Sequence, residues 1–148
     1  MTRPIPTLAT ALVCAASAAA LTACATPEDG EREPEGAAAF ADDPRLGERR
    51  DRICFGSQIN GFGQTTDRTI VVEAGVNDEY LIETFGFCPD LEFAQSIRLD
   101  QFSSCVRRGD SLIPYDSPFG PDHTDIPPAP CRINAIYEWD SDAEEAME

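Results

Sequence analysis

Four cysteines in the second part of the chain, Cys54, Cys88, Cys105 and Cys131, place the strongest constraint on its fold. They are 34, 17 and 26 residues apart and form no Cys-x-x-Cys pair, so their spacing does not fit the common zinc modules. Two structural disulfides are therefore predicted. Of the three pairings available, we favour Cys88–Cys105, which would close a local loop, together with Cys54–Cys131, which would join the domain's first and last strands.

The first 23 residues have the pattern of a secretory signal peptide. Arg3 gives a positively charged start, and an alanine-rich apolar run follows from residue 8 to residue 23. This run is about 16 residues long, which is shorter than the ~20 residues that a bilayer-spanning helix needs. Residues 1–23 are therefore expected to be removed, and Cys14 with them.

The segment Leu21-Thr22-Ala23-Cys24 places two small residues and a cysteine after a branched apolar residue. It resembles the lipobox of bacterial lipoproteins. The resemblance implies cleavage before Cys24, attachment of diacylglycerol to its sulfur and acylation of its new amino group. The inner-membrane retention signal of that family is an aspartate after the cysteine, whereas Ala25 follows here. The implied location is therefore the periplasmic side of the outer membrane, and the implied partner is the membrane through a lipid anchor.

Composition divides the rest of the chain into three parts. Residues 24–52 are rich in proline, glycine, alanine and charge, with only Phe40 and Leu46 as sizeable apolar groups. Such a segment buries too little surface to offset its ordering entropy, so a disordered tether is predicted after the lipidated cysteine. Residues 53–139 are expected to form a disulfide-stapled β domain, and residues 140–148 a solvated acidic tail.

Short runs of β-branched and aromatic residues, separated by turn residues, predict strands within this domain. The clearest runs are residues 69–73, 79–85, 96–100 and 132–139, with weaker ones at 53–55, 61–66 and 112–113. The proline-rich residues 114–130 are predicted to be a long loop. The expected fold is mainly β: a small antiparallel meander of five to seven strands, barrel-like or a sandwich, with two disulfides.

The charge balance excludes some classes of partner. Eleven arginines, no lysine and 27 acidic residues give a formal net charge of -16. Phosphate recognition needs a basic face, so the sequence opposes nucleic-acid binding. The single histidine excludes a histidine-rich metal site, and no cofactor is predicted.

Candidate catalytic groups are present without the motifs that would activate them. His123 is flanked by acids, but the Asp-x-Asp-x-Asp-Gly pattern of a calcium loop is absent. No serine lies in a Gly-x-Ser-x-Gly motif; those weighed as nucleophiles are Ser57, Ser103, Ser104 and Ser111. Glu83, Asp100 and Asp110 could form a carboxylate site only if the fold brought them together. The chain is therefore predicted not to be an enzyme.

The cysteine order, with its neighbouring residues, also resembles an uncharacterised family of small bacterial envelope lipoproteins whose domain has no known function. The resemblance covers about residues 52–137 and is carried by Arg52-Ile53-Cys54, Asp67-Arg68-Thr69-Ile70, Cys88-Pro89, Cys105 and Cys131. It supports the lipoprotein and disulfide predictions and implies no activity.

These observations predict an outer-membrane lipoprotein whose small β domain has a non-enzymatic binding or structural role, with an envelope protein as its expected partner. The alternative is an inhibitor or cell-wall-acting module, because an acidic domain would complement a basic enzyme such as lysozyme.

Overall fold

The predicted strand-forming runs are strands in the computed structural model, which describes residues 33–54, 59–63, 65–120 and 128–143. The described elements are a 3-10 helix, η1 (Gly36–Phe40), and nine strands: β1 (Leu46–Arg50), β2 (Arg52–Cys54), β3 (Ile59–Gly63), β4 (Thr69–Ala74), β5 (Asp78–Thr84), β6 (Ser96–Asp100), β7 (Cys105–Arg107), β8 (Ser111–Tyr115) and β9 (Cys131–Trp139). The predicted fold class, mainly β and antiparallel, is confirmed. No helix among the described residues is long and apolar enough to cross a membrane.

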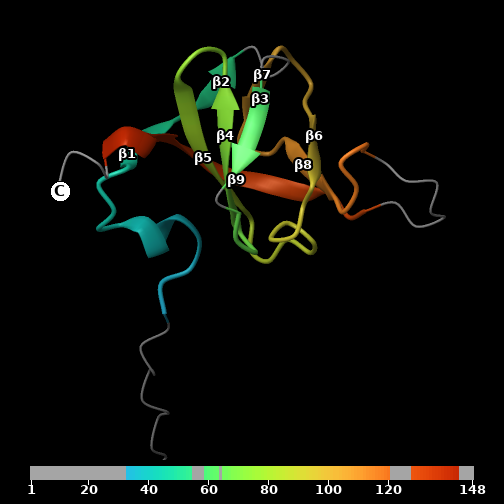
Figure 1. Ribbon diagram of the computed structural model, residues 1–148, viewed down its shortest axis with the longest axis horizontal. Coiled ribbons are helices and arrows are strands. Elements are labelled where there is room, and N and C mark those ends of the chain that lie inside the picture. Colours follow the sequence, from blue (N-terminus) through green and yellow to red (C-terminus); the bar gives the residue numbers. More distant parts are fainter. Residues whose placement is uncertain (1–32, 55–58, 64, 121–127, 144–148) are drawn as a thin grey trace, which may run out of the picture. The chain divides into compact units, whose positions relative to one another are not determined.

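One antiparallel sheet curls into a half-barrel around the long strand β9 (Figure 1). The strands follow the order β3-β4-β5-β9-β8-β6. Along one edge, β9 pairs with β5; along the other, it pairs with β8 at its beginning and with β1 towards its end. A separate ribbon of β2 and β7 contributes Ile53 and Val106 to the core of the half-barrel.

The side chains of β4 and β5 alternate between two apolar clusters. Ile70, Val72 and Ile82 lie in the main core inside the curl. Val71 and Leu81 point to the other face, where they pack with Trp139. Full burial of side chains of this size contributes about 1.5–3 kcal/mol each, so both faces of the sheet need a cover.

An N-terminal arm, residues 33–45, provides the cover on the second face. Its residues Ala37 and Phe40 pack in the cluster with Leu81 and Trp139. The rings of Phe40 and Trp139 meet edge to face with centroids 5.5 Å apart, and the Arg45 guanidinium lies 4.9 Å from the centroid of the Trp139 ring.

The prediction of a disordered tether through residue 52 is therefore wrong from the arm onward. The compact unit begins at Glu33, and β1 pairs with β9. The arm has few apolar residues, as the sequence suggested. They are sufficient to hold it on the domain because the second face of the sheet carries apolar residues that they contact. The predicted signal peptide, Cys24 and the remainder of the predicted tether lie outside the described residues.

Two disulfides are present, as predicted, but the favoured pairing is wrong: the bridges are Cys54–Cys105 and Cys88–Cys131. The strand pairing gives the reason. Cys54 on β2 lies directly opposite Cys105 on β7. The turn after β5 is bonded to the start of β9, through the Phe85 N–H and the Arg132 carbonyl, and this brings Cys88 beside Cys131.

Some element boundaries also differ from the prediction. Pro114 and Tyr115, assigned to the loop, belong to β8, where they pair with Ile97 and Ser96. At the other end, the predicted acidic tail is partly attached to the domain, because the Ser141 N–H and hydroxyl both donate to Glu79.

Candidate functional site

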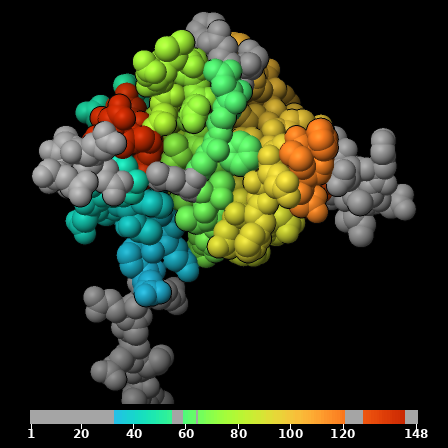
Figure 2. Space-filling model, viewed as in Figure 1, coloured from blue at the N-terminus to red at the C-terminus, as the bar shows by residue number. Residues whose placement is uncertain are grey.

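The half-barrel has an open seam between its two end strands, β3 and β6. Each pairs on one edge, with β4 and β8 respectively, and no described strand pairs with its other edge. A groove of about 410 Å³ runs along this seam, lined by residues 59–62 on one side and by residues 96–99 and 101 on the other. The green surface of β3 adjoins the yellow-to-gold surface of the residues around β6 (Figure 2).

The floor of the seam is apolar and continuous with the main core. Ile59 and Phe62 from β3, and Ile97 and Leu99 from β6, are half-buried and pack against the core cluster. A closed barrel would bury such side chains through contact between neighbouring strands. Here the opening leaves them in contact with the core and accessible from the groove.

Two polar side chains of the seam, those of Arg98 and Gln101, have unused hydrogen-bonding capacity. Arg98 is the one charged residue among the described residues that line the groove, and its side chain makes no hydrogen bond or ion pair with any described residue. The Oε1 atom of Gln101 is buried and accepts no hydrogen bond within the described part of the chain. A buried acceptor without a donor costs about 1–3 kcal/mol.

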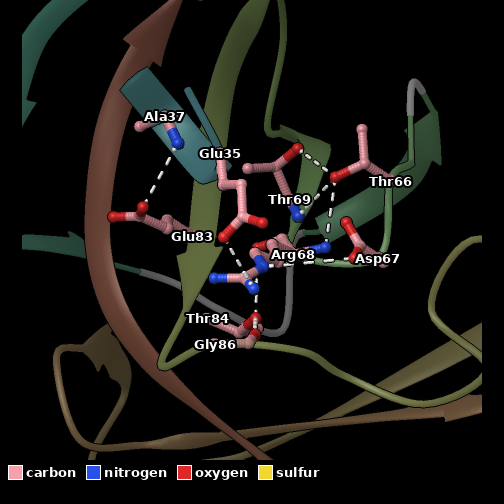
Figure 3. A network of polar contacts seen from close by, with 9 residues as sticks. All are labelled: Glu35, Ala37, Thr66, Asp67, Arg68, Thr69, Glu83, Thr84 and Gly86. Atoms are coloured by element: carbon pink, nitrogen blue, oxygen red, sulfur yellow. Dashed lines mark hydrogen bonds and ion pairs between the residues drawn. The ribbon is translucent and has the colours of Figure 1, made fainter. Parts of the chain in front are cut away.

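A second polar site fixes the N-terminal arm to the sheet (Figure 3). One carboxylate oxygen of Glu83 accepts the Ala37 N–H at 3.2 Å, and the other accepts the Asn134 side-chain amide at 3.1 Å. Arg68 forms an ion pair with Glu35 at 2.7 Å. Gly36 has a φ of 64°, and a β-carbon there would meet Glu83, so this turn requires glycine.

The carboxylates proposed from the sequence have separate roles. Glu83 holds the arm, and Asp110 accepts the Arg107 N–H at 2.9 Å across the turn between β7 and β8. Asp100 is exposed at the end of β6. No described group of three or more histidine, cysteine or acidic residues could hold a metal ion.

The serines that the structure describes take part in local structure. The Ser103 hydroxyl donates to the Cys105 carbonyl at 3.0 Å and accepts from Arg107 at 2.7 Å. Ser104 is exposed, and Ser111 is half-buried at the start of β8. Cys24, Ser57 and His123 lie outside the described residues, so the structure does not place them.

Three titratable groups among the described residues show perturbed pKa values, and none of them lines the seam. The hydrogen bond from Arg45 lowers the pKa of Asp43 and thereby favours the charged pair. The hydrogen bond that Arg50 donates to Glu138 raises the pKa of Arg50. Burial, and next the nearby charge of Asp78, raise the pKa of Tyr80. None of these arrangements places an acid or base beside an activated nucleophile.

No pattern in the sequence singles out the seam. The strand before residue 69 was expected at residues 61–66, whereas β3 is Ile59–Gly63. The alternation of polar and apolar residues over 96–100 did predict a half-buried strand, and Arg98 lies in the middle of that strand. The missing information was the strand order, because only the order shows that β3 and β6 are the two ends of the sheet.

Comparison with known proteins gives one match. The model of a family of unknown function (DUF6491) matches residues 7–148. No curated protein and no solved structure matches the chain.

Proposed function

We propose that this chain, which belongs to the family of unknown function DUF6491, is a lipid-anchored, non-enzymatic binding module of the bacterial envelope. The observation that carries the binding role is the seam: two strand edges with which no described strand pairs flank a groove that opens onto the core. Edge strands of soluble proteins are usually covered, charged or shortened to prevent association. Among the described residues nothing covers the outer edges of β3 and β6, and the floor of the groove between them is apolar, which favours a partner.

The anchor in this proposal is Cys24, supported by the preceding Leu21-Thr22-Ala23. Residues 25–32 separate Cys24 from the compact unit that begins at Glu33. Eight residues span at most about 30 Å when fully extended. The anchored domain would therefore meet partners that lie in, or close to, the membrane surface.

Cysteine accessibility in the native membrane tests the binding role. Asn60 lines the seam and is exposed, so an Asn60→Cys variant reports on occupancy of the groove. Val76 lies in the turn between β4 and β5, is 84% exposed and does not line the seam, so Val76→Cys is the matched control. Alkylation rates are measured first in isolated outer membranes and then on the protein purified in detergent.

We expect Asn60→Cys to react several-fold more slowly in membranes than after purification, because a bound partner shields the groove. The Val76→Cys rate should be the same in both samples. Equal rates for Asn60→Cys in the two samples would contradict a seam that is occupied in the envelope.

A further inference from the structure

We infer that the seam binds an extended segment of a partner polypeptide, which adds a strand between β3 and β6 and places one carboxylate beside Arg98. This inference rests on the proposed binding function and specifies the chemistry of its ligand. Three properties of the groove support this inference: its backbone edges, its apolar floor and the charge of Arg98.

The backbone edges of β3 and β6 favour a ligand that has a polypeptide backbone of its own. On the outer edge of a terminal strand, N–H and C=O groups point away from the sheet in a regular repeat, and a second strand is the ligand that pairs with such a repeat. Successive pairings from β3 to β6 are all antiparallel, so these two end strands run in opposite directions. A segment inserted between them is antiparallel to one and parallel to the other.

The apolar floor specifies the side chains of that segment. Residues of a strand alternate between two faces, so every second side chain of an inserted segment points toward the core. There it would contact Ile59, Phe62, Ile97 and Leu99, which are half-buried on the two sides of the seam. These inward side chains should be apolar, and the outward ones polar.

The charge of Arg98 favours an acidic side chain in the bound segment. Among the described residues that line the groove, Arg98 is the one with a charge, and its exposed side chain has no partner among them. A single carboxylate on the polar face of the segment complements it. Because the whole chain carries a net charge of -16, a strongly acidic peptide would be repelled. One acidic residue therefore suits the site better than several.

Synthetic peptides test the inference with the full chain purified in detergent. The probe is an end-blocked heptapeptide that alternates valine with threonine and carries one central glutamate in place of a threonine. One control peptide has the same side chains but N-methylated alternate amides, and a second has glutamine for glutamate. Calorimetry gives the affinities, and hydrogen exchange read by mass spectrometry locates the peptide.

We expect the probe to slow amide exchange in residues 59–63 and 96–100. N-methylation should weaken binding at least about tenfold, since it removes several strand hydrogen bonds. Arg98→Gln should weaken the glutamate peptide about two- to fivefold, as expected for a surface ion pair, and leave the glutamine peptide unchanged. Arg49→Gln, an equal charge change on β1 outside the seam, should affect neither peptide.

Three results would overturn the inference: no binding at millimolar probe, protection confined to other strands, or equal binding of the N-methylated peptide. Different results would contradict the proposed binding function itself. If the probe fails while Asn60→Cys is still shielded in membranes, the seam binds a partner that is not an extended strand. If the shielding is absent as well, the binding role itself is wrong.

Discussion

Replacing Cys24 with serine is expected to move the protein from the membrane fraction to the soluble fraction. In the proposed lipoprotein the Cys24 sulfur carries the diacylglycerol, and a serine hydroxyl at this position would not be lipidated. Each buried methylene contributes about 0.8 kcal/mol, so loss of several acyl chains removes far more binding energy than any single contact within the domain. The measurement is fractionation of expressing bacteria, followed by detection of the full chain in both fractions.

Cys14→Ser is the matched control because the same substitution is made in the predicted signal peptide, where it should be discarded. This variant should remain in the membrane like the wild type, and mass spectrometry of the mature protein should find Cys24 at its acylated N-terminus. Persistent membrane association of Cys24→Ser would contradict the lipid anchor without affecting the description of the fold.

The second large effect is expected from loss of the buried disulfide. The double variant Cys88→Ala with Cys131→Ala should lose about 4 kcal/mol of unfolding free energy by the loop-entropy relation, because the bridge closes a loop with a sequence separation of 43. Cys88 is 1% exposed and Cys131 8% exposed, so the two substitutions also remove packed volume from the core. Chemical denaturation of the purified chain, followed by Trp139 fluorescence, measures the change.

Matched and mismatched pairs of substitutions test the connectivity at the same time. Cys54→Ala with Cys105→Ala removes one bridge of similar loop length and should also cost about 4 kcal/mol. Cys54→Ala with Cys131→Ala removes one partner from each bridge and should cost about twice as much. If the mismatched pair were the milder change, the connectivity described here would be contradicted.

Strand composition made the class of fold predictable. Residues 69–73 and 79–85 are β-branched and aromatic runs separated by a short turn, and they form the hairpin of β4 and β5. Strand 96–100 was predicted with its observed bounds. These strands could be predicted because their residue types and their alternation of polar and apolar residues are visible in a single sequence.

The arm and the disulfide pairing required knowledge of non-local contacts. Phe40 alone gave no sign of a partner, because its partner Trp139 is about a hundred residues away in sequence. Likewise, Cys54 faces Cys105 only because β2 pairs with β7, an association that no spacing of cysteines encodes. The favoured pairing assumed that the shortest loop closes, whereas strand order determined the outcome.

The seam depended on strand order in the same way. Arg98 looked like an ordinary exposed position of a half-buried strand, and residues 61–66 looked like a weak strand with no sign that it lay at the edge of a sheet. Both segments are in fact edge strands that face one groove. The sequence predicts a non-enzymatic domain with an envelope partner, and this stays a prediction. The seam adds the place on the domain where that partner would bind.

Photo-crosslinking from the seam in living cells tests the proposal that this groove binds a partner in the envelope. A photoreactive amino acid is introduced at Asn60, with the same group at Val76 as the control outside the seam. We predict one defined adduct from Asn60, identifiable by mass spectrometry, and its absence from Val76. No adduct from Asn60, or the same adduct from both positions, would contradict the claim.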